Sequence, residues 1–458
     1  MYRELIPLRQ ALRVELRANL PPDLPGLDAE HLLQAYLNQL TLYVGTDVAD
    51  QTFSLFAVDA AGNELGHLLD VPNTPAGFEI AWAWLEELRC QHHLRIMLLA
   101  VETTGVYYWA WWDFLAGRPN LARVLYNPRT TDSMTDVLSK KVRNELVDAY
   151  ALAEQARLGS TPEVILTEDP ALLSARFCSR AARDLAQQIN RKKNQLRALL
   201  RAYNPALGQV FPGDQLHHPA VYALLQHYLL PEEFVTAGVE AITTILAQHC
   251  RTAFGRTHAQ QLVTLCAQTL TRPVGRSPIH QRVQQLAHDI LSDQQHKQHF
   301  LQTGYALIQD CVETKLLRTA KGAGISNTLA LVSELGSCSR FPDGEHMASF
   351  LGLTTSKHIS GTTLFQSKHI TKQGSPNGRY AAINLAHHLT RYVPKYQQMY
   401  ERIKNRKPPH KGHFVALTAV ARDFIANVLY AMWRDQRPFF EHVEDYRAYR
   451  QAHPRSAD

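Results

Sequence analysis

Four acidic residues have the chemistry and the placement to bind divalent metal ions. Asp47 ends a β-rich run, and Glu102 directly follows the apolar run 95–101. Glu145 and Asp148 are spaced i,i+3, which places both on one face of a helix. Hard carboxylate oxygens with open positions suit Mg²⁺ or Mn²⁺. Two such ions about 3.5–4 Å apart stabilise the attacking and leaving oxygens of a phosphodiester transfer.

Each acid also has an ordinary structural interpretation. Asp47 is compatible with a strand-terminating aspartate, and Glu102 with an acid at the N-cap of a helix. The two helical acids are compatible with a solvated face neutralised by nearby cations, Lys140, Lys141 and Arg143. A charge directly after a buried strand is costly unless it is paired or metal-bound, so the metal site remains open for Glu102.

The elements around these acids predict an α/β domain of the ribonuclease-H-like (RuvC-like) type. Three β-rich runs are followed by alternating helical and apolar strand-like runs, over 41–48, 52–58, 64–69, 74–89, 95–101, 109–115, 121–126 and 144–158. The resulting order is βββαβαβα, an antiparallel edge followed by parallel units. In this fold the first and fourth strands are neighbours, so Asp47 and Glu102 are expected at adjacent strand ends.

The remainder of the chain is predicted to be mostly α-helical. We expect a long helix over 170–202, helices over 205–310, a helix–turn–helix over 316–336, a loop over 354–378, and helices over 379–391 and 412–433. The expected organisation is a helical leader (1–40), the RuvC-like domain (41–160), a helical connector with an insertion (168–310), a C-terminal domain (311–440) and a tail (441–458).

Composition limits the class of protein. The chain has 458 residues, 48 Lys and Arg against 42 Asp and Glu, and a net charge of +6, which permits a polyanionic partner. The six cysteines form no Cys-x-x-Cys pair, which favours a reducing cytosol over a disulfide scaffold or zinc ribbon. The chain has no uncharged apolar run of 18 residues, so we expect neither membrane spanning nor secretion.

Several polar segments have both a binding and a structural interpretation. The cations spaced along 176–201 predict either a phosphate-binding face or a solvated helix face, and those over 404–411 favour an exposed loop. The turn Lys321-Gly322-Ala323-Gly324 either meets a phosphate through backbone N–H groups or simply joins two helices. The aromatic residues over 107–112 either stack bases or, more simply, form part of a core.

Two blocks of the sequence resemble insertion-sequence transposases with a RuvC-like DEDD domain, the bridge-RNA-guided recombinases. The N-terminal block contains YVGTDVADQTFSLFAVD, LLAVETTGVYYW, VLYNP and KKVRNELVDAYALAE. The C-terminal block contains LLRTAKGAGISNTLALVSELGS and RFPDGEHMASFLGLTTSKHISGTTLFQSKHITKQG, and ends with YERIKNRKPPHKGHFVALTAVARDFIANVLYAMW. Glu145 stands where the family usually has Asp, and Lys-Gly-Ala-Gly replaces the usual Pro-Gly-Ile-Gly turn.

The resemblance implies a mechanism and its residues. Asp47, Glu102, Glu145 and Asp148 take the four metal-binding positions, and Ser360, before Gly361, takes the position of a serine nucleophile. Ser356 and Ser367 remain further candidates, because the spacing after the serine is one residue longer than usual. A serine hydroxyl needs a base, a metal or a strong field to become a good nucleophile, and without the resemblance Ser-Gly indicates only a turn.

The resemblance also implies partners and a location. Expected partners are donor and target DNA, a structured non-coding guide RNA, and further copies of the chain in a dimer or tetramer that shares a composite site. The expected location is the bacterial cytoplasm, with nucleoid association during activity. Three other functions remain open: a metal-dependent nuclease or Holliday-junction resolvase without a covalent serine intermediate, a sugar-kinase-like or actin-like ATPase, and a non-catalytic RNA-binding scaffold.

Overall fold

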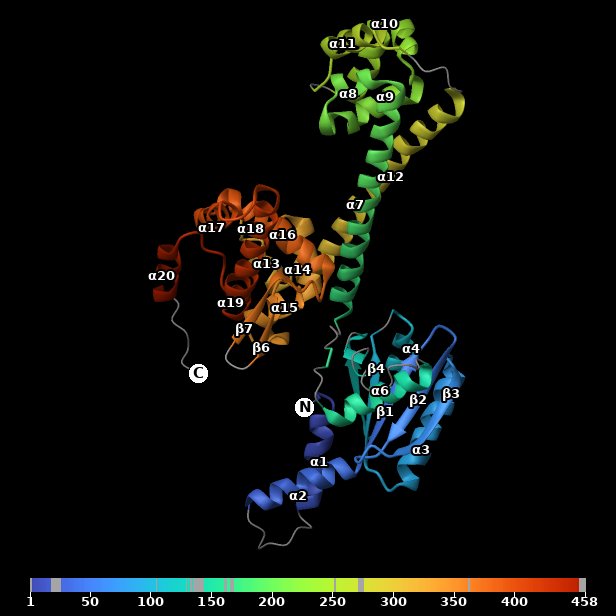
Figure 1. Cartoon of the computed structure of the whole chain (residues 1–458), viewed down its shortest axis with the longest axis vertical. Coiled ribbons are helices and arrows are strands. Elements are labelled where there is room, and N and C mark those ends of the chain that lie inside the picture. Colours follow the sequence, from blue (N-terminus) through green and yellow to red (C-terminus); the bar gives the residue numbers. More distant parts are fainter. Residues whose placement is uncertain are drawn as a thin grey trace. The chain divides into compact units, whose positions relative to one another are not determined.

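The computed structural model of the chain contains two compact units, Met1–Leu166 and Thr167–Asp458 (Figure 1). The structure describes residues 2–17, 26–103, 105–128, 130–131, 134, 144–159, 163–164, 169–250, 253–270, 276–360 and 363–452. The cations Lys140, Lys141 and Arg143, proposed above as neutralising groups, lie outside these residues.

The first unit is built on a five-stranded mixed sheet of order β3-β2-β1-β4-β5. Its elements are α1 (Leu5–Arg17), α2 (Gly26–Gln39), β1 (Thr41–Val48), β2 (Thr52–Val58), β3 (Glu64–Pro72), α3 (Pro75–Gln91), β4 (Ile96–Glu102), α4 (Tyr108–Phe114), β5 (Leu121–Tyr126) and α6 (Glu145–Leu158). The β1–β2 and β2–β3 pairs are antiparallel, whereas β1–β4 and β4–β5 are parallel. The expected strand order and the neighbouring positions of the first and fourth strands are therefore confirmed.

Successive strand residues point to opposite faces, so the sheet has two cores. Leu42 and Val44 of β1 pack with Phe78 of α3 and Trp111 of α4 on one face. Tyr43 of β1 belongs to the other core, which β4, β5, α1 and α6 also contribute to. The predicted helical leader thus forms α1 and α2, and its residues Leu5, Leu12 and Leu37 pack into this core.

The aromatic residues over 107–112 divide between core and surface. Tyr108 and Trp111 are buried in the core of the first unit, as the structural interpretation predicts. Tyr107 and Trp109 are exposed.

The second unit contains a long pair of helices that lie side by side, α7 (Pro170–Tyr203) and α12 (Arg276–Ile308) (Figure 1). Between them in the chain come α8 (Pro205–Val210), the 3₁₀-helix η1 (Gly213–His217), α9 (Pro219–His227), α10 (Pro231–His249) and α11 (Arg256–Ala267). These short helices share one hydrophobic core with Leu196 and Leu200 of α7 and Leu286 and Ile290 of α12.

The rest of the second unit forms another helical core and also contains a two-stranded hairpin. Its elements are α13 (Val312–Leu317), α14 (Ile325–Leu335), η2 (Cys338–Arg340), α15 (Gly344–Phe350), β6 (Thr355–Ser360), β7 (Thr363–Ile370), α16 (Pro376–Tyr392), α17 (Pro394–Lys404), α18 (Pro409–Asp423), the π-helix η3 (Phe424–Leu429), α19 (Tyr430–Arg434) and α20 (Val443–Ala452). Leu331, Leu385 and Phe424 bring α14, α16 and η3 into this core.

The predicted loop over 354–378 is wrong, because most of it forms the antiparallel β6–β7 hairpin. The alternation of Ile359, Leu364 and Phe365 with polar residues was too short and too rich in Ser, Thr and Lys to indicate strands. The predicted tail also contains α20, and α17 adds a helix that the basic composition of its C-terminal end concealed.

Several cations of α7 are engaged in ion pairs within the second unit. Arg176 and Arg180 both contact the carboxylate of Glu334 on α14, and Lys192 contacts Asp293 on α12 at 2.8 Å. At these three positions the charges join neighbouring helices, which neither the phosphate-binding nor the solvated interpretation of the basic helix had predicted.

One described segment, His410–Arg434, is long and apolar enough to cross a membrane by length and composition alone. In the structure it spans α18, η3 and α19, and its residues Val420, Phe424 and Leu429 lie in the hydrophobic core of the second unit. A core helix of a globular protein passes the same test, so the segment is weak evidence for a membrane span.

Candidate active site

The strand pattern places Asp47 and Glu102 on the same face of the sheet. Tyr43 of β1 and Leu98 and Ala100 of β4 pack toward α6, and side chains two residues apart share a face. By this alternation Asp47 and Glu102 also face α6. The parallel register pairs Thr46 with Val101, so the two acids are the next residues of adjacent strands.

Helix α6 brings the other two acids to this end of the sheet. Asn144 caps the helix, because its side-chain oxygen accepts a hydrogen bond from the Val147 backbone N–H at 2.9 Å. Glu145 and Asp148 lie in the first turn that follows.

Gly45 sets the distance between α6 and β1. A Cβ atom at this position would lie 1.9 Å from the carbonyl oxygen of Ala149 and 2.5 Å from the backbone nitrogen of Ala153. Only a residue without a side chain permits this approach. Gly45 is two residues before Asp47 and Ala149 directly follows Asp148, so the close packing holds the acids of the strand and the helix together.

Ser54 connects α6 to the second strand. It is buried, it pairs with Asp47 in the β1–β2 register, and its hydroxyl donates a hydrogen bond to Glu145 Oε2 at 3.2 Å. Ser54 therefore restrains a carboxylate that belongs to the exposed first turn of the helix.

The four acids form one electrostatic group. Burial, followed by the negative charges of Asp148, Glu102 and Glu145, raises the pKa of Asp47 to about 7. Every charge that contributes to this shift is an acid, and only a backbone hydrogen bond at Val48 opposes it. Asp47 is thus a partly buried carboxyl group whose ionised form is destabilised by its neighbours.

The donor set fits a divalent cation. Carboxylate oxygens are the ligands that Mg²⁺ and Mn²⁺ prefer, and a cation placed among four acids would offset their mutual repulsion. Among the described residues no three His, Cys, Asp or Glu side chains are gathered closely enough to form a metal-ligand cluster. Among the described residues, the four acids thus share one end of the sheet as an electrostatic group without forming a closed ligand cluster.

The predicted nucleophile lies on the β6–β7 hairpin. Ser360 is the last residue of β6 and pairs with Thr363 of β7, while Ser356 and Ser367 lie on the same two strands. Gly361 and the side chains of all three serines lie outside the described part of the structure.

Arg379 of α16 anchors the base of this hairpin. Its Nη1 donates to the carbonyl oxygen of Leu351 at 3.0 Å, before β6, and to that of Lys372 at 3.1 Å, after β7. Burial and the nearby charge of Arg183 lower the pKa of Arg379. One guanidinium group therefore joins both ends of the segment that carries the serines.

Sequence reasoning missed Gly45, Ser54 and Arg379. A glycine inside a β-rich run signals close backbone approach, so Gly45 could have been found. Ser54 shares the strand parity of Phe56 and Val58 but carries no local motif. The contacts of Arg379 depend on tertiary structure and have no sequence signal.

A five-stranded mixed sheet of this order followed by a helix is the arrangement of a ribonuclease-H-like domain. Comparison with known proteins agrees: residues 44–205 match the DEDD domain model of IS110 transposases, described as "Transposase". Residues 314–401 match the model described as "Transposase IS116/IS110/IS902 family". Transposase domains of the DEDD type typically use divalent metal ions.

A curated relative supports the same family. The chain is 25% identical over 303 residues to "Insertion element IS110 uncharacterized 43.6 kDa protein" of Streptomyces coelicolor, covering 66% of this chain and 73% of the relative. The chain therefore carries the two transposase domains of the IS110 family, whose activity is DNA transposition or recombination.

Proposed function

We propose that the chain cuts and rejoins DNA strands through a serine nucleophile, assisted by Mg²⁺ and guided by a structured non-coding RNA. In this proposal Asp47, Glu102, Glu145 and Asp148 bind the metal ions, and Ser360 attacks the DNA. The main support is the electrostatic grouping of the four acids around Asp47, in a chain that also carries the second transposase domain.

The proposed chemistry is a transesterification. The Ser360 Oγ attacks a DNA phosphorus, the bond from phosphorus to a bridging oxygen breaks, and that oxygen takes up a proton and leaves as a strand-terminal hydroxyl. Bound divalent ions would polarise the phosphate and help to ionise the serine hydroxyl. The phosphoserine ester retains the energy of the phosphodiester bond, so a hydroxyl of another strand can displace the serine and rejoin the DNA without an external energy source.

Ser360→Ala tests the nucleophile, with Ser356→Ala and Ser367→Ala as matched controls on the same hairpin. We expect end-labelled DNA to remain attached to the denatured wild-type protein and to both control variants, and to be lost from Ser360→Ala. Adduct formation by Ser360→Ala would contradict the assignment. Hydrolysed DNA ends without any adduct would favour the alternative, a metal-dependent nuclease or junction resolvase.

The proposal also includes three features that the family resemblance implies. These are a guide RNA, self-association in a dimer or tetramer, and a cytoplasmic location. We expect excision of a plasmid-borne element to require a non-coding RNA from the flank of the gene. Excision of equal efficiency after removal of that RNA would contradict a guided reaction.

A further inference from the structure

Two cavities in the second unit lie along α16 and share lining residues. One cavity, of about 700 Å³, lies between the turn 318–324 and the C-terminal half of α16. The other, of about 310 Å³, lies between α16, α7, α12 and α14. Ser326, Asn327 and Asn384 line both cavities, so we refer to the pair as the α16 groove.

One face of α16 forms a regular stripe along this groove. Tyr380, Asn384, His388 and Tyr392 are spaced four residues apart on this helix. Tyr380 lines the smaller cavity, His388 and Tyr392 line the larger one, and Asn384 lines both. The tyrosines at the two ends are 56% and 54% exposed, so their rings are accessible to a ligand. Twelve residues of helix separate them by about 18 Å, a length that would accommodate about five stacked nucleotides.

The charge of the groove suits a polyanion. Among the described residues that line it there is no Asp or Glu, although such residues are 42 of the 458 in the chain. Arg183 and Lys297 contribute positive charge from α7 and α12, and neither forms an ion pair with the described residues. The Arg183 guanidinium lies 5.1 Å from the centre of the Tyr380 ring, so a cation and an aromatic face are presented together.

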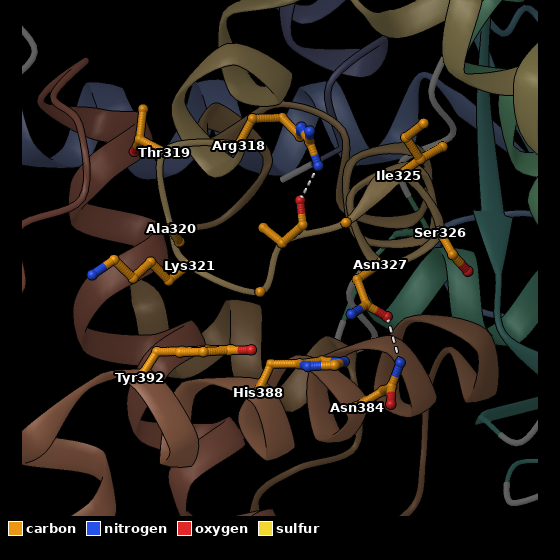
Figure 2. Close-up of a pocket in the computed structure, with 13 residues that line it drawn as sticks. Arg318, Thr319, Ala320, Lys321, Ile325, Ser326, Asn327, Asn384, His388 and Tyr392 are labelled. Atoms are coloured by element: carbon orange, nitrogen blue, oxygen red, sulfur yellow. Dashed lines mark hydrogen bonds between the residues drawn. The ribbon is translucent and has the colours of Figure 1, made fainter.

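The groove also contains amide groups that can bind the edges of nucleobases. Asn384 Nδ2 donates to Asn327 Oδ1 at 2.9 Å, which leaves the Asn327 amino group pointing into the larger cavity (Figure 2). Figure 2 also shows His388 and Tyr392 lying beneath the turn that carries Lys321, whose ammonium group pairs with Glu441 at 2.8 Å. Gly322 closes this turn onto α16, since a Cβ there would lie 2.3 Å from His388 Cβ.

We infer that the α16 groove binds a single-stranded nucleic acid segment, with bases stacked on Tyr380 and Tyr392 and phosphates near Arg183 and Lys297. Aromatic side chains on which bases stack, together with a positively charged groove that follows the backbone, are the features with which proteins bind single strands. A duplex keeps its bases stacked on one another and presents no base faces to such rings. This inference rests on the proposed function and specifies where that function holds a strand.

Binding by the full-length protein in EDTA tests the groove without strand cleavage. The probes are fluorescein-labelled RNA and DNA single strands of about ten nucleotides, measured by fluorescence anisotropy. We expect the double variant Tyr380→Ala/Tyr392→Ala to raise the Kd by about tenfold or more, and Tyr380→Phe/Tyr392→Phe to bind as the wild type does. The strand type that shows this loss, RNA or DNA, is the one that the groove holds.

Two further measurements identify where the strand binds and how many phosphate contacts Arg183 and Lys297 make. With iodouridine or iododeoxyuridine strands, we expect photocrosslinks to Tyr380 or Tyr392. Arg183→Gln/Lys297→Gln should reduce the slope of log K against log salt by about 1.4, whereas Arg256→Gln on α11 should leave the slope unchanged. Tyr36→Ala, which removes a 49% exposed tyrosine of α2, is the matched aromatic control.

Wild-type affinity in Tyr380→Ala/Tyr392→Ala, or crosslinks confined to other parts of the chain, would contradict the proposed binding of a strand in the α16 groove. Equal weakening by the alanine and phenylalanine variants would also overturn it, because the phenylalanine rings still stack. These outcomes differ from failure of the proposed function, which would appear as loss of the DNA–serine adduct in a protein that still binds strands through Tyr380 and Tyr392.

Discussion

Asp47 in the first unit and Glu334 in the second are both acids removed from bulk water, and their surroundings have opposite effects. Burial and three neighbouring acids raise the pKa of Asp47. Burial alone would also raise the pKa of Glu334, but its hydrogen bond with Arg180 and the charges of Arg180 and Arg176 lower it below the usual value. Asp47, at the end of the central strand β1, is therefore an acid that lacks a neighbouring positive charge in the described structure. Glu334, in the helical core, has two arginine side chains of the chain beside it.

This difference separates a candidate functional acid from a structural one. The Glu334 carboxylate joins α7 to α14 and also accepts a hydrogen bond from Asn377 of α16 at 3.4 Å. Asp47 joins nothing by an ion pair in the described part of the first unit. Neutralising Asp47 should therefore lower activity and stabilise the metal-free protein, whereas neutralising Glu334 should destabilise the fold.

The largest expected effect is on the activity of the first unit. Asp47→Asn and Glu102→Gln should each lower Mg²⁺-dependent strand cleavage by about a thousandfold, because a metal ligand contributes several kcal/mol of transition-state stabilisation. A cleavage assay with labelled DNA measures the loss, and Glu87→Gln, on the exposed side of α3, is the control. A decrease of less than tenfold for either acid would mean that it is not a metal ligand.

The next effect concerns folding of the second unit. Glu334→Gln should lower the free energy of unfolding by on the order of 2 to 4 kcal/mol, because it removes the negative charge that offsets the charges of Arg180 and the largely buried Arg176. The value lies toward the lower end for buried pairs since the Arg180 side chain is 55% exposed.

Urea unfolding would measure this change. The exposed Glu345, which pairs with Arg422 at 2.8 Å, supplies the matched control. Glu345→Gln should cost less than about 1 kcal/mol. Equal costs for the two substitutions would contradict the structural role of Glu334.

The same measurement on Asp47 should have the opposite sign. Asp47→Asn should raise the stability of the metal-free protein by up to about 4 kcal/mol at pH 8, because it removes an ionised carboxylate from a group of acids. The folded-state pKa, about 7, exceeds the unfolded value, near 4. The contribution of Asp47 therefore lowers stability as pH rises from about 4 to about 7.

Unfolding midpoints in EDTA between pH 4 and pH 8 would detect this slope and its loss in Asp47→Asn. Glu334 should contribute a slope of opposite sign at lower pH. Its stabilisation is complete above its unfolded pKa, 4.5, and is lost as the pH falls below that value through the lower folded-state pKa. Destabilisation of metal-free Asp47→Asn at pH 8 would identify Asp47 as a structural hydrogen-bond partner.

The smallest expected effect is at Ser54. Ser54→Ala removes the hydrogen bond to Glu145 and should cost about 1 kcal/mol in stability. It should also weaken Mg²⁺ binding, measured by calorimetry, because the Glu145 side chain becomes less restrained. Ser349→Ala, in the second unit, should leave Mg²⁺ affinity unchanged. Unchanged Mg²⁺ affinity in Ser54→Ala would exclude Ser54 as a positioning residue.

Sequence patterns predicted the first unit better than the second. The order of strands and helices along the chain followed from apolar runs, which report burial directly. The fold that this order indicates then placed Asp47 and Glu102 at adjacent strand ends. The hairpin that carries Ser360 was taken for a loop, because its strands are short and polar. The pairing of Arg180 with Glu334 across more than 150 residues could not be predicted, since either charge alone indicates a solvated surface.

The candidate site shows the same limit. The residue types and the i,i+3 spacing of Glu145 and Asp148 were visible in the sequence, and their grouping with Asp47 needed the seating of α6 on β1. The Asn327–Asn384 contact and the tyrosine stripe of α16 were missed because neither matches a metal or nucleophile motif.

The bare backbone at position 45 has a mechanical consequence. Two of the four acids belong to a helix and two to the strands beneath it. The distance between the helix and the sheet therefore determines whether oxygens from both can reach a shared ion. This distance is short because residue 45 has no Cβ atom, and not because a hydrogen bond or ion pair at that residue draws the helix in. Substitution of Gly45 by any residue with a Cβ would therefore widen the gap between the two pairs of acids, even though residue 45 itself offers no ligand.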